Sequence, residues 1–265
     1  MSGRRLRHLR RSIGQLLRLY RARTLRDGFF SYLAFFLPFG WERRLGRLQL
    51  AGQRFVARGL DWVAVDEIAL RGEYDFVRPL LAGPRPVVVD IGANIGMFSL
   101  FAFHVNRDAS VYAFEPSPDT FGLLQSNRRS NPSLAWQCHH AAVHARDGMI
   151  RFDNRPASTA RRVCLEDGDP VPCLSLRTVV DRVAAPVTLL KIDVEGSEEA
   201  ILVGNEAVLE TVAHLVIELH PGACRTDAVV DTLTRAFPYV HRIRGRESGK
   251  PLLLATRARL DLPPA

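Results

Sequence analysis

The stretch that most constrains the fold is residues 87–96, which read VVVDIGANIG. Three β-branched residues in a row predict a buried strand, and the apolar periodic run after Gly96 predicts a helix. Between them, Gly92 lets the backbone turn sharply and lets another group approach where a Cβ would intrude. Gly96 is expected to let the helix pack closely on the strand. We therefore expect a ligand of the nucleotide type at the carboxyl end of this strand.

The charge of this loop indicates which ligand would bind there. It lacks a Gly-Lys-Ser/Thr sequence and opens with the carboxylate of Asp90, so phosphate is a poor fit. S-adenosylmethionine has an amine and a sulfonium but no phosphate, and it suits an acidic loop better. Glu115 follows a second strand-like run, 111–114, where a carboxylate can accept both hydroxyls of a ribose. The alternative is that Asp90 and Glu115 only cap the ends of strands.

The length and the charge distribution point to one catalytic body with an appendage. A chain of 265 residues is long enough for one large domain and an arm. The net charge of +8 comes from residues 1–26, which hold nine arginines and no acidic residue. Without these nine, 27 basic residues face 28 acidic ones. The four cysteines show no CxxC spacing, which favours reduced thiols and a cytoplasmic location.

We divide the chain into an arm, residues 1–48, and a catalytic domain, residues 49–265. In the arm, apolar residues recur at steps of three and four among arginines, a pattern typical of a basic amphipathic helix. Such a helix can lie on an anionic membrane surface, contact a partner or stay solvated, and these roles remain open. The aromatic segment 29–41 is too short to span a bilayer, and we expect neither a signal peptide nor a transmembrane helix.

The rest of the chain predicts alternating strands and helices. Residues 54–57 and 62–65 are strand candidates before the glycine loop, and residues 154–172 are expected to form a long loop. A helix over 97–105, a strand over 111–115, a helix over 118–129, a third strand over 135–143 and a β-ribbon at 148–152 follow from the pattern. This alternation predicts a doubly wound α/β fold.

A second informative cluster lies at residues 187–199. An apolar strand ends in Asp193 and Glu195, and Glu198 and Glu199 then open a helix, where acids suit the helix dipole. In a doubly wound sheet the first and fourth strands border the ligand crevice, so Asp90 and Asp193 should face the same cleft. A fifth strand, 215–219, delivers His220 to the same edge.

Three motifs together resemble the FkbM family of S-adenosylmethionine-dependent methyltransferases. They are DIGANIG at 90–96, FEP at 114–116 and KIDVEGSE at 191–198. The resemblance implies a Rossmann-like class I methyltransferase sheet of seven strands with an antiparallel last strand, which residues 239–243 and 252–256 could complete. It also implies O-methylation of a sugar, glycan or other small-molecule hydroxyl. By this resemblance, the cofactor-binding residues are Asp90, Gly92, Asn94, Gly96 and Glu115.

Methylation of an alcohol requires a base within reach of the hydroxyl proton. Asp193 and His220 are the candidates, with Glu195 behind them. The carboxylates of Asp193, Glu195 and Glu218 could hold Mg²⁺, but side chains along a strand alternate between opposite faces. We therefore assign no metal ligand.

Other classes of protein fit the sequence less well. A nicotinamide dehydrogenase would prefer glycine where Asn94 stands. A nucleic-acid methyltransferase would need a basic catalytic face, so no nucleic-acid partner is expected. A non-catalytic protein, associated with the membrane surface through its basic arm, could retain a cofactor-like pocket.

Overall fold

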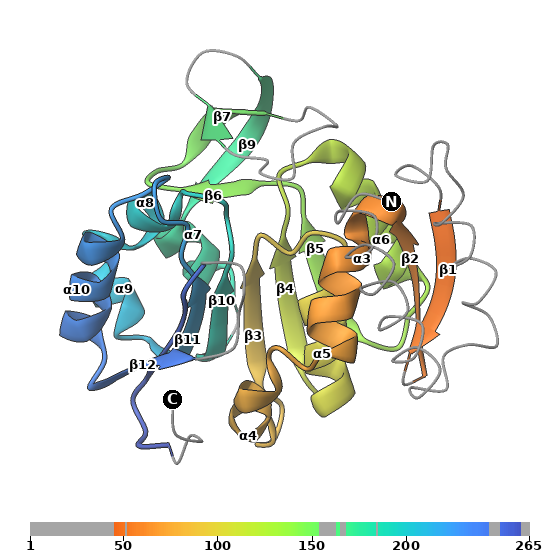
Figure 1. Ribbon diagram of the computed structural model, residues 1–265, viewed down its shortest axis with the longest axis horizontal. Coiled ribbons are helices and arrows are strands. Elements are labelled where there is room, and N and C mark those ends of the chain that lie inside the picture. The colour runs from red at the N-terminus through yellow and green to blue at the C-terminus, as the bar shows by residue number, and fades with distance from the viewer. Residues whose placement is uncertain are drawn as a thin grey trace, which may run out of the picture.

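The computed structural model describes residues 45–50, 52–153, 163–164, 168–183, 185–243 and 250–260. Its centre is a seven-stranded sheet in the order β12-β13-β11-β10-β3-β4-β5. The strands are β3 (Val87–Ile91), β4 (Ser110–Phe114), β5 (Ala135–His139), β10 (Val187–Ile192), β11 (Val212–Glu218), β12 (Tyr239–Ile243) and β13 (Leu252–Thr256). Chain order reverses between β3 and β10, which lie side by side in the middle (Figure 1). This is the doubly wound sheet that the sequence predicts.

The pairing of the strands confirms the seven-stranded arrangement with one antiparallel strand. β11, β10, β3, β4 and β5 pair in parallel. β13 runs antiparallel to both of its neighbours, β11 and β12. All five residues of β3 are buried, as expected for the central strand of a sheet that is covered on both faces.

Helices cover both faces of the sheet and enclose two apolar cores. One core includes Val88 and Leu189, together with residues of α5 (Met97–Val105) and α6 (Pro118–Arg129). The other includes Val89 and Leu190 and is covered by α7 (Leu176–Asp181), α8 (Glu198–Leu202), α9 (Glu206–Leu209) and α10 (Thr226–Ala236). Neighbouring strand residues thus enter opposite cores, which is the two-residue period of a pleated sheet.

The strand predicted over residues 62–65 is wrong, because this segment is helical. It lies in a run formed by η2 (Gly59–Asp61), α3 (Trp62–Ala64) and η3 (Val65–Leu70), which leads to η4 (Asp75–Val77) and α4 (Arg78–Leu81). The Asp61 carboxylate accepts the backbone N–H of Arg58 at 2.7 Å and so caps the start of the run. Trp62 and Val65 are buried, whereas Val63 is 52% exposed. Burial therefore follows a helical spacing of three residues rather than the two-residue spacing of a strand.

A second sheet of four strands projects beyond the edge at which β3 and β10 end (Figure 1). Its order is β6 (Ala142–His144), β9 (Asp169–Ser175), β7 (Gly148–Phe152), β8 (Val163–Cys164). The predicted ribbon at 148–152 is confirmed, but the predicted strand over 135–143 is divided between the two sheets. Part of the predicted loop 154–172 is strand, and residues 154–162 and 165–167 lie outside the described residues.

The prolines of β9 explain why its strand was missed. Pro170 and Pro172 pair with β7 on one side, whereas β6 pairs only with residues 173–175 on the other side. Among the described residues, no strand pairs with the other side of the first half of β9, and a residue that lacks an N–H is tolerated there.

The described chain begins with a hairpin of β1 (Leu45–Leu50) and β2 (Gln53–Arg58). β1 starts within the segment assigned to the arm, and Leu48 is buried in the first core. The predicted amphipathic helix and the aromatic segment 29–41 lie outside the described residues. None of the helices in the described part of the chain has the length and apolar character needed to cross a membrane.

Substitutions at Val65 and Val63 test the helical periodicity of this segment. We expect Val65→Ala to lower the free energy of unfolding by roughly 2 kcal/mol, because it removes buried methyl groups. Val63→Ala should change it by less than about 0.5 kcal/mol. Chemical denaturation measures both. Equal losses would contradict the helix, because residues 63 and 65 share a face only in a strand.

Candidate active site

The glycine loop lies at the carboxyl end of β3, where three residues adopt left-handed backbone conformations. Gly92, Asn94 and Gly96 have φ angles of 74°, 53° and 90°. The backbone N–H groups of Gly92 and Ala93 both donate to the carbonyl of Phe114, each at 3.0 Å. The loop is thus tied to the end of β4.

The close approaches at the two glycines differ from those expected. A Cβ on Gly92 would lie 1.8 Å from the backbone oxygen of Asp193, so the group that approaches there is the chain leaving β10. A Cβ on Gly96 would lie 2.5 Å from the Trp136 ring and 2.8 Å from Leu124. Gly96 therefore lets the start of α5 pack against β5 and α6, in addition to ending the turn.

Asp90 is completely buried beneath the loop. Its carboxylate accepts a hydrogen bond from Ser99 Oγ at 2.7 Å and lies 3.2 Å from the ammonium of Lys191. Lys191 is the residue of β10 that stands in register with Asp90. Its Nζ also donates to the carbonyl of Gly92 at 2.8 Å and lies 3.9 Å from Asp193. Lys191 thus lies between Asp90 and Asp193; the two were expected to face one cleft, but Asp90 is completely buried.

The charged state of Lys191 is stabilised by its carboxylate neighbours. Burial favours the neutral amine, but the charges of Asp90 and Asp193 outweigh this effect and raise the pKa of Lys191. Sequence reasoning assigned no role to Lys191. The position of Lys191, one residue before the end of the fourth strand and beside Asp90 of the first, could have indicated that it pairs with Asp90.

Glu115 lies at the end of β4 and fixes the neighbouring backbone. Its Oε2 accepts the N–H of Asn94 at 3.0 Å, and its Oε1 accepts the N–H of Ser117 at 2.9 Å. Glu115 is 7% exposed. The structure thus links two predicted cofactor residues, Glu115 and Asn94, through one hydrogen bond.

A second group of side chains surrounds His220, which follows β11. The ring is 5% exposed. Its Nε2 lies 3.1 Å from Glu195 and 3.8 Å from both Asp193 and Glu218. Its Nδ1 lies 2.5 Å from Oε1 of the completely buried Glu198. All three predicted catalytic residues, Asp193, Glu195 and His220, are therefore brought together.

The argument from strand alternation does not apply to Asp193 and Glu195, because β10 ends at Ile192 and both residues follow it. Glu195 and Gly196 then have φ angles of 53° and 111°, and the turn brings the Glu195 carboxylate beside that of Asp193.

Two neighbouring glutamates that open α8 have different partners. Glu199 pairs with the exposed Arg225 at 2.6 Å, whereas Glu198 holds the ring of His220. Helix-start electrostatics therefore does not account for Glu198. The sequence gave one indication of a role for Glu198, its place shortly after Asp193. Its partner His220, however, follows a strand that is distant in the sequence.

The carboxylates and the imidazole change each other's acidity. Burial disfavours the charged imidazole, but the neighbouring carboxylates of Glu195 and Glu198 outweigh it and raise the pKa of His220 to about 10. Burial and the charge of Asp193 raise the pKa of Glu218 to about 8. The Lys250 ammonium lies 3.0 Å from Glu195 and 3.6 Å from Glu218. The cluster is thus a dense and strongly coupled group of charges.

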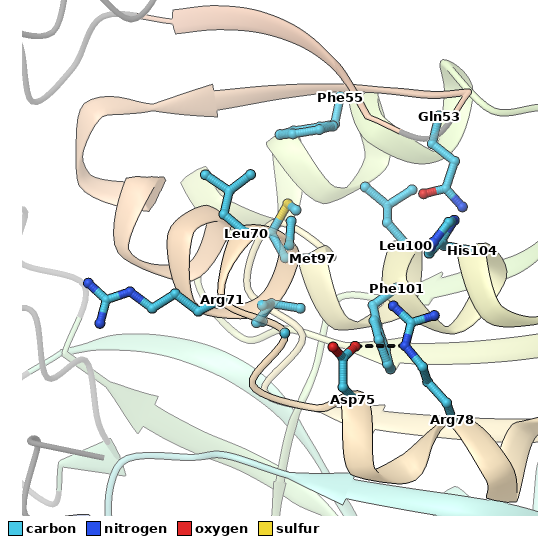
Figure 2. Close-up of a pocket in the computed structure, with 13 residues that line it drawn as sticks. Gln53, Phe55, Leu70, Arg71, Asp75, Arg78, Met97, Leu100, Phe101 and His104 are labelled. Atoms are coloured by element: carbon cyan, nitrogen blue, oxygen red, sulfur yellow. Dashed lines mark hydrogen bonds and ion pairs between the residues drawn. The ribbon is translucent and has the colours of Figure 1, made fainter. Parts of the chain in front are cut away.

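A cavity of about 230 Å³ is lined by residues of α5, β2 and η3 (Figure 2). Figure 2 shows Asp75 and Arg78, which also line it, paired next to Phe101. None of the site residues predicted from the sequence lines it, so the cavity is separate from the two groups described above.

The family of the chain follows from a comparison with protein-family models. The model described as the methyltransferase FkbM domain matches residues 90–244, more than half of the chain. The chain belongs to the FkbM methyltransferase family. The match includes both groups of site residues apart from Lys250.

Two curated relatives show what the family contains. The chain is 32% identical over 158 residues to the hexuronic acid methyltransferase AglP of Haloferax volcanii, covering 58% of this chain and 64% of the relative. It is 31% identical over 173 residues to the 31-O-demethyl-FK506 methyltransferase FkbM of Streptomyces tacrolimicus, covering 52% of this chain and 66% of the relative. The chain thus spans slightly less than two thirds of the length of these relatives.

Solved structures with a similar fold include two methyltransferases. A precorrin-6y C5,15-methyltransferase from Geobacter metallireducens has a TM-score of 0.47 at 13% identity and covers 71% of this chain and 89% of its own. An rRNA methylase from Streptococcus thermophilus has a TM-score of 0.45 at 14% identity, with coverages of 69% and 92%. The fold assignment itself rests on the order and direction of the strands.

Replacing Gly92 by alanine tests the contact between the loop and Asp193. We expect Gly92→Ala to lower the free energy of unfolding by about 2–5 kcal/mol, because the new Cβ overlaps a backbone oxygen and the φ angle disfavours alanine. Gly122→Ala in α6 is the matched control, since a Cβ there meets no atom within 4 Å. It should be neutral or slightly stabilising. Similar stabilities of the two variants would contradict the contact.

Proposed function

We propose that this protein transfers a methyl group from S-adenosylmethionine to a hydroxyl of a sugar, glycan or other small molecule. The observation that carries the proposal is the junction of the two matched motifs. The glycine loop after β3 and the Asp193 cluster after β10 meet at the point where strand order reverses, and ligands of doubly wound sheets bind there.

The groups around the loop have the chemistry that S-adenosylmethionine requires. Residues 90–96 contain no lysine or arginine, and the carboxylate of Glu115 stands at the end of the next strand. A carboxylate accepts about four hydrogen bonds, so Glu115 can hold backbone N–H groups and ribose hydroxyls together. Asp90 is completely buried, so its carboxylate does not reach the surface of the loop where a ligand would lie. We propose that Asp90 acts through Lys191, Ser99 and the shape of the loop.

The residues after β10 and β11 are proposed to handle the acceptor. Bound S-adenosylmethionine supplies a methyl group that is already activated on a sulfonium, so the protein has to orient the acceptor hydroxyl and remove its proton. The Asp193 side chain is 32% exposed, compared with 26% for Glu195 and 5% for His220. Asp193 is therefore the proposed base. His220, held by Glu198, positions the two carboxylates.

The acceptor class is proposed from the relatives. One is a hexuronic acid methyltransferase, and the other acts on 31-O-demethyl-FK506. Both names describe small or sugar-like acceptors. This fits the near-neutral charge of the chain outside residues 1–26, which does not favour a nucleic-acid acceptor.

Two conservative variants separate cofactor binding from methyl transfer. We expect Glu115→Gln to weaken S-adenosylmethionine binding by roughly 10-fold or more, since hydrogen bonds to a charged group contribute about 1.5–3 kcal/mol. Asp193→Asn should leave this affinity unchanged and slow transfer by about 10²–10⁴-fold. Calorimetry measures the first effect and labelled-methyl transfer the second, with Glu199→Gln as the control. Equal cofactor affinities in all variants would contradict this division of roles.

We also propose that the basic arm binds the surface of an anionic membrane from the cytoplasmic side. The support is its sequence, with nine arginines in residues 1–26 and apolar residues at helical spacing. The full chain should co-sediment with vesicles that contain anionic lipid and not with neutral vesicles. Replacing Arg7, Arg10 and Arg11 by glutamate should abolish the difference. Equal sedimentation with both kinds of vesicle would contradict the proposal.

A further inference from the structure

The potential ligand atoms of Asp193, Glu195 and His220 lie close together. One ligand atom from each residue lies within 4.8 Å of the other two. His220 Nε2 is 3.1 Å from Glu195 Oε2 and 3.8 Å from Asp193 Oδ1. Ligands about 2.1 Å from a common metal ion lie roughly 3–4 Å apart, so the two separations from Nε2 suit a coordination shell.

The orientation of His220 is an independent observation. Its Nε2 is buried and makes no hydrogen bond of acceptable geometry to any described residue, although it faces these carboxylates. Its Nδ1 is engaged by the buried carboxylate of Glu198. A metal ion would displace the proton of Nε2, while Nδ1 still donates to Glu198, and the lone pair of Nε2 is then directed toward Asp193 and Glu195. Metal-binding histidines are commonly held by a carboxylate in this way.

The charges of the region favour a cation. Five carboxylates are connected through Lys191, Lys250 and His220, and they belong to Asp90, Asp193, Glu195, Glu198 and Glu218. The two ammonium groups balance two of them. Three carboxylates then remain against one imidazole, so acids outnumber bases in this region, and a divalent ion would compensate this excess.

We propose that Asp193, Glu195 and His220 bind a divalent metal ion. One imidazole nitrogen and two carboxylate oxygens suit a first-row ion such as Mn²⁺ or Zn²⁺ better than Ca²⁺, which prefers six to eight oxygen ligands. Asp193 would bind through Oδ1, the oxygen that faces His220, while Oδ2 remains on the side of Lys191.

Three protein ligands leave coordination positions for an acceptor. A hydroxyl bound there would lose its proton more readily, because a metal ion lowers the pKa of an oxygen that it binds. This consequence rests on the proposed methyl transfer, whereas the binding of the ion does not.

The test is a calorimetric titration of the full chain, after treatment with EDTA, with Mn²⁺ and separately with Zn²⁺. We expect one ion per chain for at least one of the two metals. Glu195→Gln should weaken binding at least 10-fold, because it replaces a charged ligand. Glu198→Gln should weaken it by about 10–100-fold through the orientation of His220. Glu199→Gln is the matched control in the same helix, and it should bind like the unmodified chain.

Glu195 lies at the surface of the cluster, so its substitution should leave the fold intact, and circular dichroism of each variant checks this. Failure of both metals to bind at millimolar concentration would overturn the proposal. Equal affinities of Glu195→Gln and Glu199→Gln would also overturn it. A parallel titration with S-adenosylmethionine keeps the two proposals separate: cofactor binding without metal binding removes the metal site alone.

Discussion

The buried ion pair of Asp90 and Lys191 is the interaction on which the site depends. The Asp90 side chain is completely buried and that of Lys191 is 4% exposed. An unpaired charge at such a position is strongly destabilising, often by about 3–5 kcal/mol. The pair therefore requires β3 and β10 to lie in the register in which these residues are neighbours. The same ammonium holds the carbonyl of Gly92 and faces Asp193, so it fixes the ends of both strands.

From this pair the site extends in two directions. Toward β4, the glycine loop is held by the Phe114 carbonyl and the Glu115 carboxylate. Toward β11, the turn after β10 places Asp193 and Glu195 against His220. Gly92 links these two parts of the site, because the loop contacts the backbone of Asp193 there and leaves no room for a side chain. Cofactor residues and acceptor residues are thus parts of one packed unit.

Local sequence patterns were sufficient to predict the central strands, the glycine loop and the placement of Asp193 and His220 at one edge of the sheet. Buried β-branched runs and glycines determine these features over short distances. The segment at Trp62 was predicted wrongly because four apolar residues fit a strand or a helix equally well, and tertiary burial decided between them. The prolines of β9 hid a strand whose partner is not adjacent in the sequence.

The missed roles have a common cause. Glu198 and Lys191 are buried charges whose partners come from other strands, so their role depends on tertiary pairing that a local pattern does not contain. The position of Glu195 depends on a left-handed turn after Ile192 that strand alternation could not predict. Alternation is reliable within a strand and gives no information beyond its last residue.

Binding of S-adenosylmethionine to the purified chain tests the central claim most directly. The measurement is a calorimetric titration, with NADH as the control ligand. The account predicts one S-adenosylmethionine per chain, with affinity in the micromolar range, and no binding of NADH. Absence of S-adenosylmethionine binding by a folded chain, or equal binding of both ligands, would contradict it.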